Sequence, residues 1–191
     1  MKIIGITGSS GAGKNTVCEI IEKKYDAEVI DADQIAKELS KKGTMYLNSI
    51  INCFGTEIID KKGELNRKKL ANIIFEDDKK REELNKLTFV HVVEEIQKRI
   101  TKIKKKIIVV NAPLLFESNL NKVCDFVIAV IADKDKQLKR IMNRDNISKE
   151  EAEKRINAQN SNEFFAENAD YIIYNNEEIE NIEKQLLSIK I

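Results

Sequence analysis

The sequence predicts a three-layer α/β fold, in which helices cover both faces of a parallel five-stranded sheet. Two patterns along the 191 residues lead to this prediction. Short apolar runs without alternation are typical of parallel strands, because both faces of such strands are buried. Between these runs, apolar residues recur at helical spacing, as at Val17, Ile20 and Ile21. Alternation of strands and helices indicates a parallel sheet with right-handed crossovers.

Five apolar runs are the predicted strands, at residues 3–6, 28–30, 107–110, 126–131 and 171–174. A helix is expected after the first run, around Val17. Another is expected after the last run, where Ile179, Ile182 and Leu186 repeat the helical spacing.

Two long stretches interrupt this alternation. Residues 34–106 are highly charged and helical in pattern, with no evident strand, so we expect a helical insertion at the carboxyl edge of the sheet. Residues 134–160 form a second helical stretch, in which Ser148 and Glu151 have the spacing of a capping box. We therefore expect a single domain, 1–191. Its core would comprise about residues 1–33, 107–133 and 161–191.

Composition excludes several classes of function. The 33 basic and 32 acidic residues nearly cancel, so no bulk positive charge marks a binder of nucleic acid or membranes. The single histidine, His91, argues against a histidine-rich zinc site and a Ser-His-Asp mechanism. Cys18, Cys53 and Cys124 are far apart and odd in number, which is typical of a reducing cytosol. No apolar run approaches the length of about 18 residues of a membrane span. These features favour a cytoplasmic protein.

Residues Gly8–Lys14 carry the strongest functional signal. They match Gly-x-x-x-x-Gly-Lys, directly after the first strand and at the start of the first helix. Glycines let successive backbone N–H groups converge on phosphate oxygens, and the helix N-terminus adds a positive dipole end. Lys14 has the position that reaches the β- and γ-phosphates. The loop is therefore expected to bind a nucleoside triphosphate.

The position after Lys14 is usually Ser or Thr, whose hydroxyl binds Mg²⁺, but this chain has Asn15. An amide oxygen can also bind a hard cation. Two alternatives stay open: Asn15 binds the metal ion through its amide oxygen, or Thr16 does so through a shifted first helical turn.

Asp31 and Asp33 follow the second strand directly. In open parallel sheets the carboxyl ends of strands face the ligand, so one of these carboxylates could be the base for an attacking hydroxyl. Alternatively, both cap the helix expected over residues 34–39. A switch GTPase is disfavoured, because the nearest guanine-reading sequence begins at Asn121 and ends in Cys124 instead of Asp. A small-molecule kinase fits better.

Three of the six arginines are Arg140, Arg144 and Arg155. Arg140 and Arg144 share one helix face, and Arg155 shares a face with Gln159. One guanidinium group can donate two parallel hydrogen bonds to phosphate oxygens. Residues 134–160 are therefore expected to form a lid over the polyphosphate. The alternative for each arginine is a surface salt bridge with a glutamate at 150, 151 or 153.

From residue 3 to about residue 175, the sequence resembles the dephospho-coenzyme A kinase family. The stretches that carry the resemblance are the phosphate loop, Ile30–Ala36, Phe54-Gly55, Leu65–Leu70 with Ile74-Phe75, Pro113–Glu117, Gln137–Arg140 with Arg144-Asp145, Arg155 with Ala158-Gln159, and Ala169–Ile173 with Asn175.

The resemblance implies a P-loop kinase fold, with 34–106 on the coenzyme A side and 134–160 as the lid. It implies transfer of a phosphoryl group from ATP, with Mg²⁺, to the ribose 3′-hydroxyl of dephospho-coenzyme A, the last step of coenzyme A synthesis. The implied catalytic residues are Asp33, as the base, with Lys14 and Arg140. The implied ATP-binding residues are Gly11, Ala12, Gly13, Lys14, Asn15, Thr16, Arg140, Arg144 and Asn175, of which Asn15 would also hold Mg²⁺. The implied substrate-binding residues are Thr7, Asp33, Arg67, Leu114, Phe116, Glu117 and Arg155.

The chain differs from the family pattern at four places. Besides Asn15, Asn111 stands where an Asp often precedes the Pro-Leu-Leu stretch, Phe89-Val90 replaces a His-Pro pair, and Phe165 replaces a common basic residue. His91 is therefore expected to be an ordinary helix residue. Two rival functions stay open: another nucleoside or nucleoside-monophosphate kinase, and an ATP-binding regulator with little turnover. No nucleic acid, membrane or obligatory protein partner is expected.

Overall fold

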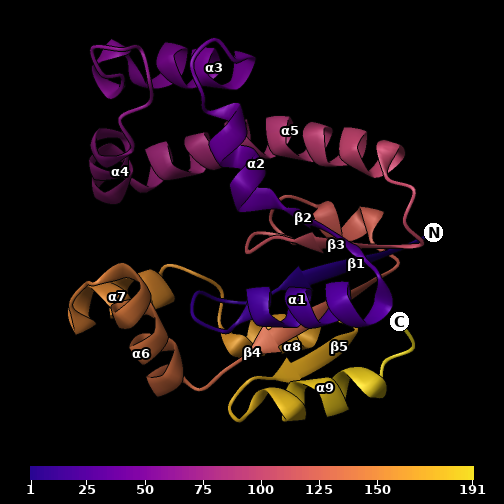
Figure 1. Ribbon diagram of the computed structural model, residues 1–191. Helices are drawn as coiled ribbons and strands as arrows, with labels where there is room; N and C mark the ends of the chain where they lie inside the picture. The colour runs from indigo at the N-terminus through magenta and orange to yellow at the C-terminus, as the bar shows by residue number, and fades with distance from the viewer. The chain divides into compact units, whose positions relative to one another are not determined.

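The computed structural model describes residues 1–191, apart from the side chain of Glu76 (Figure 1). The chain forms two compact units, which are described separately. The larger contains residues 1–30 and 103–191, and the smaller contains residues 31–102. Within the described residues, no helix is both long and apolar enough to cross a membrane.

A five-stranded sheet has the order β2-β3-β1-β4-β5. Its strands are β1 Lys2–Thr7, β2 Glu28–Asp31, β3 Ile107–Asn111, β4 Phe126–Ile131 and β5 Tyr171–Tyr174. The central strand β1 is parallel to both neighbours, with Ile4 opposite Val109 on β3 and opposite Phe126 on β4. Strand β5 continues the parallel pairing on β4. The predicted α/β fold with a parallel five-stranded sheet is confirmed, and each predicted strand is found within two residues of its expected bounds.

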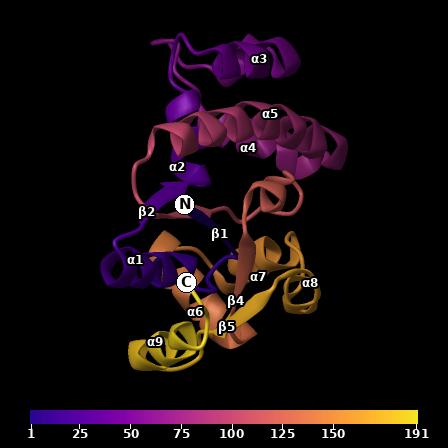
Figure 2. The ribbon, with the colours of Figure 1, turned by 90° about the vertical axis from the view of Figure 1, so that its right-hand side faces the viewer.

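Helices cover the sheet of the larger unit on both faces (Figure 2). Helices α1 (Lys14–Tyr25) and α9 (Ile179–Leu187) pack on one face, where their apolar residues join Ile4, Ile6 and Ile128 in one core cluster. Helix α8 (Asn162–Asn168) lies on the other face and contacts β4. Gly5 faces that side too, since a Cβ there would lie 3.0 Å from the side chain of Leu115. The alternation of helices and strands thus produces the expected three layers.

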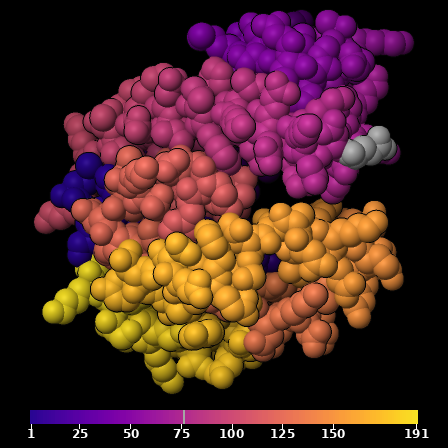
Figure 3. Space-filling model, turned by 180° about the vertical axis from the view of Figure 1, so that it is seen from behind, coloured from indigo at the N-terminus to yellow at the C-terminus, as the bar shows by residue number. Residues whose placement is uncertain are grey.

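Helices α6 (Lys134–Asp145) and α7 (Lys149–Asn157) form one end of the larger unit, as Figures 1 and 3 show. They pack on each other through Leu138, Ile141 and Ala152. The predicted capping box is confirmed: the Ser148 hydroxyl accepts from the Glu151 backbone N–H at 3.2 Å, and the Glu151 carboxylate accepts from the Ser148 N–H at 3.1 Å. This cap fixes where α7 begins.

The smaller unit is helical, as the sequence predicts for this stretch. Its helices are α2 Ala32–Leu39, α3 Met45–Phe54, α4 Arg67–Glu76 and α5 Asp78–Lys102, with the short 3₁₀ helix η1 at Thr56–Ile58. Tyr46, Ile50 and Leu70 belong to its own buried cluster. Within the described residues of this unit, Ile59 and Leu65 form an isolated antiparallel β-bridge. Helix α2 begins two residues earlier than expected, which places Asp33 in its first turn.

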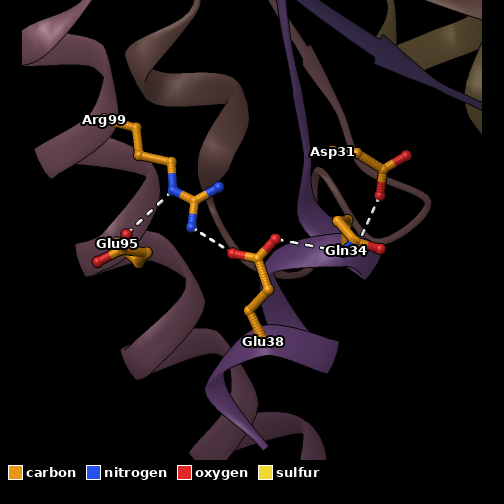
Figure 4. Close-up of polar contacts among 5 residues, drawn as sticks. All are labelled: Asp31, Gln34, Glu38, Glu95 and Arg99. Atoms are coloured by element: carbon orange, nitrogen blue, oxygen red, sulfur yellow. Dashed lines mark hydrogen bonds and ion pairs between the residues drawn. The ribbon is translucent and has the colours of Figure 1, made fainter.

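An ion triad of Glu38, Arg99 and Glu95 ties α2 to α5 (Figure 4). The Arg99 Nη2 donates to the Glu38 carboxylate at 2.6 Å, and its Nε donates to Glu95 at 3.0 Å. The hydrogen bond from Arg99 lowers the pKa of Glu38 below its ordinary value of 4.5. Because the side chains of Arg99 and Glu38 are 37% and 36% exposed, water screens the pair and its contribution to stability is small.

We expect Arg99→Met to lower the free energy of unfolding by about 0.5 kcal/mol at pH 7, the range of exposed ion pairs. A carboxylate with a lowered pKa in the folded state stabilises above its unfolded-state pKa, and this contribution is lost as pH falls through the folded-state pKa. The difference from wild type should therefore shrink between pH 7 and pH 3.5, as measured by urea unfolding. Arg81→Met removes an exposed pair within α5 and is the matched control. An equal loss in both variants at both pH values would contradict a specific role for the triad.

Candidate active site

The loop between β1 and α1 takes a path that glycine alone tolerates at three places. Gly8, Gly11 and Gly13 have φ values of 138°, 75° and 97°. A Cβ on Gly8 would lie 2.2 Å from the carbonyl oxygen of Val130, and a Cβ on Gly13 would lie 1.9 Å from the amide nitrogen of Asn175. The predicted phosphate loop thus has the strand–loop–helix setting and the close backbone packing that its motif requires.

Lys14 lies at the start of α1, and its ammonium group folds back over the loop. Its Nζ donates to the carbonyl oxygens of Gly8 at 2.8 Å and Ser9 at 3.1 Å. The positive charge is therefore held at the beginning of the loop. This is the end at which a lysine of this motif meets the β- and γ-phosphates.

Side chains from α6 and the end of β5 hold the carbonyl side of the loop. Arg140 Nη1 donates to Gly11 O at 3.1 Å, and its Nη2 donates to the backbone oxygen of Asn175 at 3.0 Å. The Asn175 amide donates to Ala12 O at 2.8 Å. In addition, the buried amide of Gln137 donates to the Ser9 hydroxyl at 2.8 Å. The bonds from Arg140 and Asn175 occupy carbonyl groups of the loop and none of its N–H groups.

Arg144 and Arg155 share an acidic partner for which no role was predicted from the sequence. Both bind Asp145: Arg144 Nη2 at 2.8 Å and Arg155 Nη1 at 2.5 Å. The hydrogen bond from Arg144 is the main cause that lowers the pKa of Asp145, so this carboxylate is charged at neutral pH. Asp145 thus gathers two guanidinium groups where α6 meets α7.

The two asparagines that differ from the family pattern are in direct contact. The amide nitrogen of Asn111, at the end of β3, donates to the amide oxygen of Asn15 at 3.0 Å. Asn111 is buried, whereas Asn15 is exposed at the start of α1. The contact orients the Asn15 oxygen, which keeps a second lone pair. That lone pair is an oxygen ligand of the kind that Mg²⁺ accepts, so Asn15 offers one neutral ligand for the ion.

The stretch Pro113–Glu117 follows β3 and faces the segment after α7. The buried Thr7 hydroxyl donates to Pro113 O at 3.3 Å, which links this stretch to β1. Phe116 makes an edge contact with Phe164, with ring centroids 5.8 Å apart. Glu117 accepts from the Asn160 amide at 2.7 Å. Although Glu117 as a residue is exposed, partial desolvation of its carboxyl raises its pKa.

Gln159, next to Asn160, touches the phosphate loop itself. Its side-chain oxygen accepts from the Ser10 backbone N–H at 2.6 Å. The prediction that Gln159 shares a helix face with Arg155 is wrong, because α7 ends at Asn157 and Gln159 lies beyond it. No role was predicted for Gln159 from the sequence. Gln137, Asp145 and Asn160 likewise had no predicted role. Their only sequence signal was their place beside or within the stretches that carry the family resemblance.

In the smaller unit, Asp31 and Asp33 have different settings. The Asp31 carboxylate caps α2 by accepting from the Gln34 N–H at 2.8 Å (Figure 4). The capping alternative thus applies to Asp31. Asp33 is an exposed carboxylate in the first turn of α2. Arg67, at the start of α4, donates to the Ser40 hydroxyl at 2.5 Å.

The larger unit therefore brings together most of the expected ATP-side residues. Within it, the phosphate loop, Arg140 and Asn175 form one hydrogen-bonded set, while Arg144 and Arg155 form another with Asp145. Asp33 and Arg67 belong to the smaller unit.

Sequence comparison with known proteins points to one family. The family model described as dephospho-CoA kinase matches residues 2–181. A dephospho-CoA kinase of Fusobacterium nucleatum is 42% identical over 184 residues, which cover 96% of this chain and 94% of the relative. One of Listeria innocua is 40% identical over 190 residues and covers 98% and 94%.

Among solved structures, the dephospho-CoA kinase from Campylobacter jejuni is similar, with a TM-score of 0.68 and 28% identity. The match covers 98% of this chain and 95% of that structure. Sequence relatives and fold thus agree over nearly the whole length. The chain belongs to the dephospho-CoA kinase family.

Proposed function

We propose that Asp33, Lys14 and Arg140 carry out the reaction of this family in this chain. As a family member, the chain uses ATP to phosphorylate dephospho-CoA at its ribose 3′-hydroxyl, which completes coenzyme A synthesis. The observation that carries the proposal is the phosphate loop, with its three left-handed glycines and the ammonium of Lys14 at its start. Such a loop presents N–H groups and a fixed positive charge to a triphosphate.

The proposed ATP site comprises Gly11–Thr16, with Arg140, Arg144 and Asn175. The contacts of Arg140 and Asn175 to loop carbonyl groups support this assignment, because they hold the loop in shape. Lys14 would stabilise negative charge on the transferring phosphoryl group. Arg140, one turn from Arg144 on α6, would act with the lid arginines on the same charge.

The proposed substrate side comprises Thr7, Asp33, Arg67, Leu114, Phe116, Glu117 and Arg155. We propose that the smaller unit, with the stretch Pro113–Glu117, binds dephospho-CoA, and that residues 134–160 act as the lid. Asp33 would accept a hydrogen bond from the 3′-hydroxyl and take its proton. Its exposed place in the first turn of α2, where neighbouring Asp31 already serves as the cap, supports this role.

Mg²⁺ is the proposed metal ion. The amide oxygen of Asn15, oriented by Asn111, would hold it beside the phosphates. A bound Mg²⁺ supplies positive charge that offsets the charge developing on the phosphoryl oxygens. Asn15 and Asn111 are both neutral amides, so neither position contributes a carboxylate to the proposed metal site.

A cytoplasmic location is proposed from the chemistry of the cysteines, and no obligatory protein partner is expected. Cys18, Cys53 and Cys124 are thiols rather than disulfides. Burial raises the pKa of Cys53 to about 11 and that of Cys124 to about 12. Both groups therefore remain protonated and weakly reactive at neutral pH. Cysteines without disulfides are typical of a reducing compartment.

The acceptor is tested by the release of ADP from the purified protein with Mg·ATP. We expect release to depend on dephospho-CoA, with coenzyme A as the product identified by mass spectrometry. AMP and adenosine serve as competing acceptors. Faster turnover with either of these would favour the rival nucleoside or nucleoside-monophosphate kinase.

Asp33→Asn should lower kcat by about 10²-fold or more, because it removes the general base. ATP affinity, measured by calorimetry, should stay near that of wild type. Asp31→Asn is the matched control, since asparagine caps a helix as well as aspartate does. Near-wild-type turnover of Asp33→Asn, or an equal loss in both variants, would rule out Asp33 as the base.

Asn15→Ala should raise the Mg²⁺ concentration for half-maximal turnover by at least about tenfold, since even outer partners of a metal contribute that much. Binding of Mn²⁺ to the nucleotide complex, followed by paramagnetic resonance, should weaken in parallel. Thr16→Val tests the alternative ligand. If Thr16→Val alone weakens metal binding, the ion is held by Thr16 and not by Asn15.

A further inference from the structure

The Gln159 side chain accepts a hydrogen bond from a backbone N–H group of the phosphate loop. Its oxygen lies 2.6 Å from the Ser10 backbone nitrogen. The Lys14 ammonium donates to the carbonyl groups of Gly8 and Ser9, the two residues immediately before Ser10. Because a lysine of this motif reaches the β- and γ-phosphates, the Ser10 N–H belongs to the terminal-phosphate end of the loop. A neutral amide oxygen thus stands where a phosphate oxygen is expected.

The next residue carries a second contact, to another part of the larger unit. The Asn160 amide donates to Glu117, at the end of the stretch Pro113–Glu117, at 2.7 Å. Gln159 and Asn160 lie in the short turn between α7, which ends at Asn157, and α8, which begins at Asn162. Adjacent residues of one turn therefore bind the phosphate loop and the proposed substrate stretch. A movement of one side chain that shifts the turn changes both contacts.

We propose that Gln159 is a specificity and positioning residue: it occupies the Ser10 N–H until the terminal phosphate of a nucleoside triphosphate displaces it, and the displacement shifts Asn160 away from Glu117. The inference rests on the proposed binding of ATP by the loop. A phosphate oxygen is charged and accepts more strongly than an amide oxygen, so the triphosphate displaces Gln159. A diphosphate lacks the terminal group and leaves the Gln159 contact in place.

This arrangement has two consequences. Binding of a triphosphate includes the loss of the Gln159–Ser10 bond, whereas binding of a diphosphate does not. Only the triphosphate breaks the hydrogen bond between Asn160 and Glu117. The contacts of the substrate stretch therefore change when a phosphoryl donor is bound and not when the product ADP is bound. Coupling of this kind needs a differential interaction of the ligand with two states, which the Ser10 N–H provides.

The first consequence is tested by calorimetric titration with ADP and with the non-hydrolysable triphosphate adenylyl imidodiphosphate. Gln159→Ala should raise the ratio of Kd for ADP to Kd for the analogue by about 2- to 10-fold, the effect of one hydrogen bond. Gln159→Glu should lower the ratio, since a carboxylate repels the phosphate. The control is Asn157→Ala, which truncates an exposed carboxamide at the end of α7. An unchanged ratio in Gln159→Ala overturns the proposal. A lowered ratio also overturns it, because Gln159 would then be a retained phosphate ligand.

The second consequence is tested with a fluorescent reporter, because the chain has no tryptophan. In Phe164→Trp, the introduced indole would stand at the edge of Phe116, beside Glu117. We expect the triphosphate analogue to change its emission, ADP to leave it unchanged, and Asn160→Ala to abolish the difference. Equal responses to both nucleotides would overturn the coupling. If Phe164→Trp fails to fold, fluorine resonances of wild type labelled with fluorophenylalanine report the same site.

The two possible failures are distinguishable. If neither nucleotide binds to wild type, the proposed ATP site itself is wrong. If both bind and the ratio is insensitive to Gln159, the ATP site stands and the displacement mechanism is rejected.

Discussion

The close packing of the loop backbone between Gly8 and Gly13 is the constraint on which the rest of the site depends. Loop N–H groups can converge on a ligand only if the carbonyl groups, which point the other way, find partners elsewhere. Arg140 and Asn175 supply these partners from α6 and from the end of β5. The carbonyl of Val130 on β4 leaves no room for a side chain at Gly8. Elements far apart in the chain thus fix one short loop.

In the stretch proposed as the lid, one acid pairs with two arginines. Arg144 and Arg155 share the carboxylate of Asp145. The negative charge of Asp145 offsets the repulsion between the two guanidinium groups and holds them near each other. Arg140, on the same helix as Arg144, instead binds the loop. A row of similar side chains therefore divides into one residue that supports the loop and two that are held by a neighbouring acid.

The differences from the family pattern at Asn15 and Asn111 form a pair. The Asn111 amide donates to the Asn15 amide oxygen, so the two positions are joined by one hydrogen bond. The pair keeps an oxygen ligand at the start of α1 while removing a negative charge from the end of β3. The metal site proposed here is therefore less acidic than the family pattern implies.

Local sequence patterns were sufficient for the strands, the capping box at Ser148 and the phosphate loop, because each depends on residues close together in the chain. The parallel sheet pairs distant residues, but the alternation of strands and helices was enough to predict it. Patterns could not reveal the partners of the arginines, the contact of Asn15 with Asn111, or the contact of Gln159 with Ser10. Except for the neighbours Arg144 and Asp145, those pairs join residues from 10 to 149 positions apart. Side-chain hydrogen bonds leave no periodic trace in a sequence. The sequence by itself determined which chemistry the chain contains. Only the tertiary structure decided which polar groups meet, because that depends on how the strands and helices pack.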